Sequence, residues 1–120
     1  MEDMKLGVVE SKFADIIWAN EPLPSRRLVE LCQVELNWKK PTTYTVLRKL
    51  CERGIFQNAD GMVTSRISRE DFYAMQSEKF VEETFAGSLP AFLAAFTTRK
   101  SLTAEEIAQI RSLIDGFEEG

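Results

Sequence analysis

The sequence predicts a mainly α-helical protein with one small β-hairpin, ordered as a winged helix-turn-helix followed by a helical C-terminal region. Three helical patterns of apolar residues come first, one hairpin signal follows them, and further helical patterns fill the rest. Short connections between the first three helices fit a compact three-helix core. We therefore expect a winged-helix domain over residues 1–68 and a helical dimerisation domain over residues 69–120.

The first two helices are predicted from apolar stripes at helical spacing. The helix over residues 9–20 carries Val9, Phe13, Ala14, Ile16 and Ile17 on one face, and two prolines in residues 20–24 end it. The helix over residues 25–36 has an inward face at Leu28, Leu31 and Cys32, with Val29 at its margin.

The third helix is predicted over residues 41–53. Pro41 suits its first turn, where the missing N–H has no helical partner, and Gly54 supplies a left-handed stop. One face carries Thr43, Val46, Leu47 and Leu50, which we expect to pack on the first two helices.

A hairpin follows, and then three more helices. Strand-like runs over residues 55–58 and 62–67 flank an Asp-Gly turn. Ser68 is a predicted N-cap for a long helix that reaches Phe85. Pro90 opens a short apolar helix over residues 90–96, and a capping box at residues 103–106 begins the last helix. The expected apolar faces of the long helix and the last helix comprise Phe72, Met75, Phe80, Val81, Thr84, Ile107, Ile110, Leu113, Ile114 and Phe117.

Composition excludes several classes of protein. The 120 residues are 44% hydrophobic and 28% charged, which rules out wholesale disorder. There is no histidine, so the commonest general base and the usual zinc ligand are missing. Cys32 and Cys51 stand apart and form no metal or redox motif, so we expect two buried, reduced thiols. We predict no catalytic residue, no metal site and no cofactor.

Nothing in the sequence predicts a membrane protein. The longest apolar run, residues 91–96, is far shorter than the ~20 residues that span a bilayer. No signal peptide is recognised at the start of the chain, so we expect a cytoplasmic protein.

Charge is distributed unevenly along the chain. The net charge is −4, yet residues 38–66 hold six Lys or Arg residues against two carboxylates, while residues 67–120 are strongly acidic. This asymmetry favours a surface that faces a polyanion and a separate acidic tail.

The outward face of the third helix has the chemistry of a surface that enters the major groove. Short hydroxyls, one phenol and long cations lie there, beside further cations and a helix N-terminus. Threonine methyls contact thymine, hydroxyls bond phosphates or base edges, and arginine pairs with guanine. The candidate DNA-binding residues are Lys39, Lys40, Thr42, Tyr44, Thr45, Arg48, Lys49 and Arg66.

Some of these residues have a structural alternative. Thr42 caps the helix or contacts a base, and Tyr44 faces outward or folds back onto the core. Arg66 reaches the minor groove or the DNA backbone, or forms a structural salt bridge. Trp38 is expected in the core rather than on a stacking surface. The acidic hairpin tip at Asp60 argues against strong phosphate contacts there.

The tail carries more large apolar side chains than isolated helices can hide. Either they all pack back on the winged helix or they cover a second subunit, and we favour a homodimer. The candidate dimerisation residues are Phe80, Phe85, Leu89, Phe92, Leu93, Phe96, Ile107, Ile110 and Ile114. A two-fold dimer would place two recognition helices about 34 Å apart, or a multiple of that, on a palindromic operator.

Three stretches of the chain resemble the penicillinase-repressor (BlaI/MecI/CopY) family. They are residues 10–18 (ESKFADIIW), Trp38 with residues 42–50 (TTYTVLRKL), and residues 52–55 (ERGI). The likeness covers nearly the whole chain and is most specific in the third helix. It implies a homodimeric winged-helix repressor that binds double-stranded DNA. Lys49 and Glu52 replace the usual arginine and lysine, so affinity or site sequence can differ.

The resemblance also bears on how the repressor is released. Some members of the family sense copper through C-terminal cysteines, which this sequence lacks. Others are cleaved by a sensor-linked protease between an asparagine and a phenylalanine, and the corresponding pair here is Ala95-Phe96. Release by a sensor protease near this pair is therefore implied, although the first residue departs from the family.

A rival function is a winged helix that docks on another protein. Its third helix would then face a protein segment rather than DNA. Retention of random duplex DNA at low salt separates the two functions, because phosphate neutralisation underlies non-specific binding.

Overall fold

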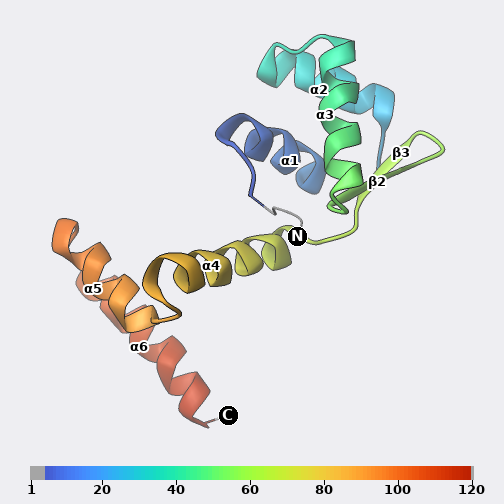
Figure 1. Ribbon diagram of the computed structural model, residues 1–120. Coiled ribbons are helices and arrows are strands. Elements are labelled where there is room, and N and C mark those ends of the chain that lie inside the picture. The colour runs from blue at the N-terminus through green and yellow to red at the C-terminus, as the bar shows by residue number, and fades with distance from the viewer. Residues whose placement is uncertain (1–4, 120) are drawn as a thin grey trace. The chain divides into compact units, whose positions relative to one another are not determined.

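The computed structural model describes residues 5–119 and contains six helices and a small antiparallel sheet within that range (Figure 1). This confirms the predicted fold class. In chain order the elements are α1 (Val8–Asn20), β1 (Leu23–Pro24), α2 (Ser25–Leu36), α3 (Lys40–Glu52), β2 (Phe56–Ala59), β3 (Met62–Ser65), α4 (Arg69–Phe85), α5 (Leu89–Arg99) and α6 (Ala104–Glu119).

The chain divides into two compact units between Ser77 and Glu78. The expected boundary after residue 68 falls just before α4, whereas the first turns of α4 pack within the first unit. Phe72 is fully buried there, and its ring lies 5.6 Å from that of Trp18. Trp18 in turn donates its indole N–H to the carbonyl oxygen of Ile67 at 3.0 Å. An aromatic contact and a hydrogen bond thus attach the start of α4 to α1.

The core of the first unit follows the predicted stripes with few exceptions. Its buried hydrophobic residues are Phe13, Ala14, Ile16, Ile17, Leu23, Leu28, Cys32, Leu47, Leu50, Ile55, Phe56, Val63 and Phe72. Val9, which the sequence predicts to lie inward, is about half exposed in the first turn of α1. Trp38 stacks on Phe13 with ring centroids 5.4 Å apart, so it packs against the core as expected.

The sheet has one strand that the sequence did not predict. The Asp-Gly turn is confirmed: Ala59 pairs with Met62, and Asp60 and Gly61 both have positive φ, as the tight turn requires. The missed strand is β1, which pairs antiparallel with β3 to give the order β1-β3-β2. Strand β1 has only two residues, one of them a proline, which is too short for a period-two pattern, so only its pairing with β3 reveals it.

The second unit, from residue 78 onward, consists of the end of α4 with α5 and α6. The capping box predicted at residues 103–106 is confirmed, and Ser88 is an N-cap that the sequence analysis did not predict. Ser88 accepts a hydrogen bond from the N–H of Ala91, and Thr103 and Glu106 form a reciprocal capping box at 2.9 and 3.0 Å. Helix α5 runs to Arg99 rather than Phe96, and hydroxyls of Thr97 and Thr98 bond carbonyls one turn back in this added segment.

Candidate nucleic-acid interface

Helix α3 presents the candidate surface, and its inward face fixes its orientation. Thr43, Leu47 and Leu50 are buried, and Val46 is half-buried against the same core. The opposite face therefore points to solvent, where Thr42, Thr45, Arg48 and Lys49 are all exposed. The angular division of this helix predicted from the sequence is confirmed except at Tyr44, which is half-buried.

Two side chains with polar groups, Thr43 of α3 and Cys32 of α2, are buried in the core beneath this helix. The hydroxyl oxygen of Thr43 is buried with no hydrogen-bond partner among the described residues, and it lies beside the thiol of Cys32. Desolvation raises the pKa of Cys32 to about 11, opposed in part by the Thr43 hydroxyl. Cys51 is half-buried rather than buried, and desolvation also raises its pKa. Both thiols are free and reduced, as expected.

The beginning of α3 is left open. Lys39 is the N-cap residue and makes no side-chain cap, and Thr42 lies inside the helix, so the capping alternative for Thr42 does not hold. The first helical N–H groups consequently lack a side-chain acceptor within the described part of the chain. Lys39 and Lys40 stand next to these N–H groups, and both are exposed. Uncapped N–H groups beside two ammonium groups form a region that attracts an anion.

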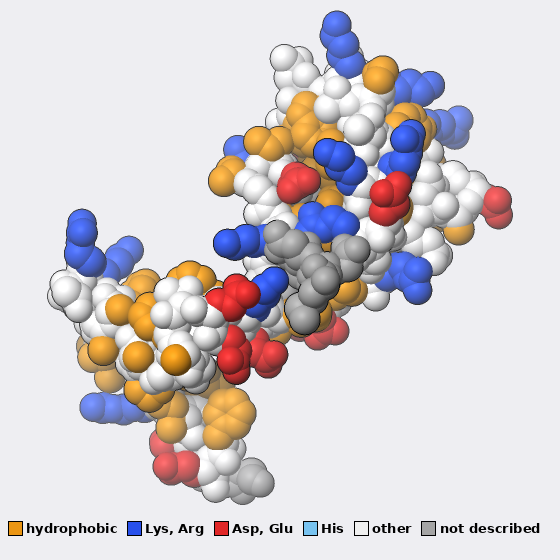
Figure 2. All heavy atoms as spheres, viewed as in Figure 1, with side chains coloured by type: hydrophobic (Ala, Val, Ile, Leu, Met, Phe, Trp, Pro, Cys, Tyr) orange, Lys and Arg blue, Asp and Glu red, His pale blue; other side chains and the backbone are white. Residues whose placement is uncertain are grey.

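The cations of the surface are not engaged within the fold. Lys39, Lys40, Arg48, Lys49 and Arg66 have no side-chain hydrogen bond or ion pair to any described residue. The structural salt bridge considered for Arg66 is therefore not formed there. Arg53, by contrast, donates to the carbonyl oxygen of Lys5 at 2.6 Å, and this bond ties the N-terminal segment to the end of α3. Figure 2 shows Lys and Arg side chains over the unit that contains α2 and α3.

Two residues of the predicted strip differ in their detailed chemistry. Tyr44 is half-buried and packs against the core, and its hydroxyl donates to the hydroxyl of Ser25 at 3.1 Å. Its expected outward orientation is thus wrong in part. Thr45 donates its hydroxyl hydrogen to the carbonyl oxygen of Pro41 at 2.9 Å, so it offers a methyl group and an acceptor lone pair outward.

Glu21, just after α1, and Ser25, the first residue of α2, make polar contacts that sequence patterns did not reveal. The carboxylate of Glu21 accepts bonds from the backbone N–H and the hydroxyl of Ser65, at 2.7 and 2.8 Å. The N–H of Ser25 donates to the carbonyl oxygen of Gly61 at the hairpin tip. Neither Glu21 nor Ser25 belongs to a motif; Glu21 directly follows α1, and Ser25 is the first residue of α2.

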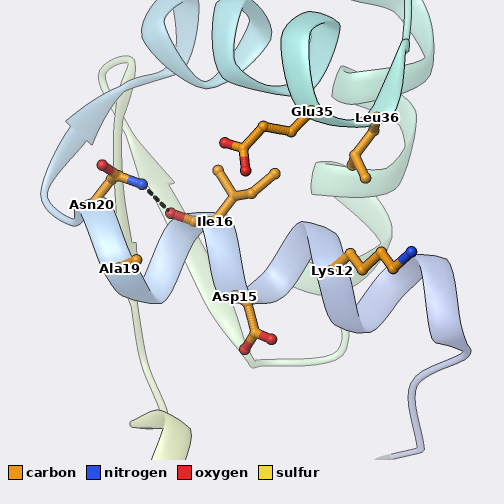
Figure 3. Close-up of a pocket in the computed structure, with 7 residues that line it drawn as sticks. All are labelled: Lys12, Asp15, Ile16, Ala19, Asn20, Glu35 and Leu36. Atoms are coloured by element: carbon orange, nitrogen blue, oxygen red, sulfur yellow. Dashed lines mark hydrogen bonds between the residues drawn. The ribbon is translucent and has the colours of Figure 1, made fainter.

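A shallow groove of about 310 Å³ lies between α1 and α2 (Figure 3). Its lining mixes apolar residues with Lys12, Asp15, Asn20 and Glu35, and the amide of Asn20 donates to the carbonyl oxygen of Ile16 at 2.8 Å. Asp15 also accepts a bond from Arg69 at 2.9 Å. No residue of α3 lines this groove, so it is separate from the candidate surface. Within residues 5–119, no group of three potential metal ligands occurs.

The candidate dimerisation residues lie together in the second unit and stay accessible. Rings of Phe80, Phe85, Phe92 and Phe96 form a cluster with centroids 5.7–6.2 Å apart. Phe80, Leu89, Phe96 and Ile114 are about half exposed, and the other candidate residues are half-buried. Ala95 and Phe96, the candidate cleavage pair, are both exposed on α5. No described helix is long and apolar enough to cross a membrane.

Comparisons with known proteins agree with this geometry. A family model described as penicillinase repressor matches residues 6–116. The methicillin resistance regulatory protein MecI of Staphylococcus aureus strain Mu50 is 21% identical over 115 residues, covering 92% of this chain and 94% of that protein. The proteins of the same name from Mammaliicoccus sciuri and Staphylococcus epidermidis are each 20% identical over the same shares.

Proposed function

The chain belongs to the penicillinase repressor family of DNA-binding transcriptional repressors, and from this premise we propose that it acts as a homodimer on a palindromic operator, with α3 in the major groove. The outward face of α3 carries the proposal. It joins exposed hydroxyls and unpaired cations to an uncapped helix N-terminus. Phosphates would be neutralised by the lysines at the helix start, while Arg48 and Thr45 would contact base edges.

The second unit supports the homodimer. Residues 78–118 contain no fully buried side chain, although many of them are large and apolar. A helical unit in water is stabilised mainly by burial of its apolar face, so a second copy of this unit is the occupant that we propose. Two α3 helices would then follow the two-fold symmetry of the operator, about 34 Å apart or a multiple of that.

Release by a sensor-linked protease near Ala95-Phe96 is the regulatory part of the proposal. Both side chains are exposed, and α5 has no buried residue, so local opening of this helix costs less than opening of the core in the first unit. Cleavage there would separate α6 from the aromatic cluster and thereby weaken the dimer.

The test is a binding comparison between Arg48→Ala and wild type. Duplexes recovered by selection from a random pool serve as specific DNA, and a scrambled duplex serves as non-specific DNA. We expect Arg48→Ala to lose about 1–3 kcal/mol on the selected duplex and less on the scrambled one, because a bidentate contact to guanine is lost. Arg99→Ala, which changes an exposed arginine in the second unit, is the matched control and should bind as wild type does.

Two outcomes would count against the proposal at different levels. Equal losses on both duplexes would assign Arg48 to a phosphate. Failure of the wild-type protein to retain any duplex at low salt would reject DNA binding and favour a protein-docking role.

A further inference from the structure

We propose that Glu21 is a positioning residue for DNA binding, whose carboxylate holds the β2–β3 hairpin at Ser65 and thereby sets the place of Arg66 beside the duplex. This inference rests on the proposed function. The wing is defined as residues 56–65, the two strands and their turn.

The contacts of Glu21 are concentrated on one residue of the wing. One carboxylate oxygen accepts the backbone N–H of Ser65 at 2.7 Å, and both oxygens lie 2.8 Å from the Ser65 hydroxyl. These bonds are partly buried, and Glu21 itself is half-buried. Bonds from donors to a charged oxygen are stronger than neutral ones, so this contact is a firm attachment.

Strand register explains why a side chain is needed at this point. The pairs Leu23↔Val63 and Pro24↔Met62 place residue 21 opposite residue 65 when the register is continued. Residue 21 lies before β1 begins at Leu23, so β1 supplies no backbone carbonyl to the N–H of Ser65. In the β2–β3 ladder, hydrogen-bonded and non-hydrogen-bonded pairs alternate, starting from the hydrogen-bonded pair Ala59↔Met62 next to the turn. The pair that contains Ser65 is therefore non-hydrogen-bonded, and the N–H of Ser65 points away from β2. The Glu21 carboxylate therefore replaces a ladder bond.

Ser25, the first residue of α2, also bonds to the far end of the wing and to α3. The N–H of Ser25 donates to Gly61 at the wing tip at 2.7 Å, and the Ser25 hydroxyl accepts from Tyr44 of α3. Residues 21–25 thus bond to the wing at its base and its tip, and to α3. Arg66 directly follows the base attachment, and its side chain is exposed. Movement of the wing base would displace this guanidinium relative to α3.

The test compares Glu21→Gln, Glu21→Ala and Arg66→Ala on the selected duplex, under conditions where each variant is folded. The amide oxygen that Glu21→Gln introduces could still accept the Ser65 N–H, so we expect affinity within about two-fold of wild type. Glu21→Ala should weaken binding about ten-fold and flatten the salt dependence by about one phosphate contact. In the Arg66→Ala background, Glu21→Ala should have little further effect, because the positioned group is gone.

A readout without DNA accompanies these measurements. Amide hydrogen exchange of Ser65 should quicken in Glu21→Ala and stay slow in Glu21→Gln. Glu83→Ala, which removes an exposed carboxylate from the second unit, should change neither exchange nor binding.

Three outcomes would overturn the inference while leaving DNA binding intact. In the first, the Ser65 amide stays protected in Glu21→Ala. In the second, Glu21→Ala and Glu21→Gln tighten binding equally on every duplex, which identifies Glu21 as a mere repulsive charge. In the third, Glu21→Ala and Arg66→Ala lower affinity additively. Failure of wild type to bind any duplex would instead reject the proposed function.

Discussion

The two units of this chain bury their apolar residues to very different extents. The first contains a core with residues such as Phe13, Phe56 and Phe72 at 0% exposure, contributed by helices and strands alike. The second has only half-buried or exposed side chains in residues 78–118, including Phe80 at 47% and Phe117 at 78% exposure. Apolar content is thus not the same as apolar burial. The first unit has its own core, whereas the apolar side chains of the second unit stay partly exposed.

The largest effect expected from this contrast concerns the core of the first unit. Phe56 is fully buried, and its ring lies 5.3 Å from that of Trp18. Phe56→Ala should lower the free energy of unfolding by about 3–5 kcal/mol, since it removes a buried ring and leaves a cavity. Denaturant unfolding followed by tryptophan fluorescence measures the loss. A loss below about 1 kcal/mol would mean that the core is far looser than its burial indicates.

The next effect concerns self-association through Phe80, an exposed aromatic residue of the second unit. Phe80→Asp should raise the monomer–dimer dissociation constant on the order of 100-fold, because it introduces a charge into the proposed interface. Sedimentation equilibrium measures this dissociation constant. Val34→Asp makes the same kind of change at a residue that is 83% exposed in the first unit, and it should leave assembly unchanged. A dimer that tolerates Phe80→Asp would place the subunit interface elsewhere.

The third effect concerns the buried thiol. The pKa of Cys32 is about 11, above its ordinary value of 9.0, so the folded state retains a proton that the unfolded state loses. The resulting stabilisation is present below pH 9 and is lost as the pH rises toward 11. The difference in unfolding free energy between wild type and Cys32→Ala should therefore shrink by about 2–3 kcal/mol over this window. Parallel pH profiles would contradict the burial of this thiol.

Much of the fold could be predicted because its signals are local. The apolar stripe of α3, the stop at Gly54 and the Asp-Gly turn depend on residues that are neighbours in sequence. The capping box at Thr103 and Glu106 spans one helical turn. Such features are set by backbone geometry and helical periodicity, which a single sequence displays directly.

Parts of the candidate site could not be predicted for the opposite reason. The angle of Tyr44 on α3 indicates an outward residue, but its hydroxyl reaches Ser25, nineteen positions earlier in the chain. The sequence leaves open whether Phe80 packs on the winged helix or on a second subunit, and the structure shows it 47% exposed. Both facts depend on which elements lie nearby in space, and no local pattern encodes that.

The sequence by itself determined the order of the elements, the inward face of α3 and the cations on its opposite face, since helical periodicity fixes which side chains share a face. Only the tertiary structure decided that Glu21 and Ser25 bond to the wing, that Tyr44 is tied to α2, and that the apolar side chains of the second unit are only partly covered. The physical reason is that hydrogen bonds and burial depend on distances between segments that are far apart in the chain.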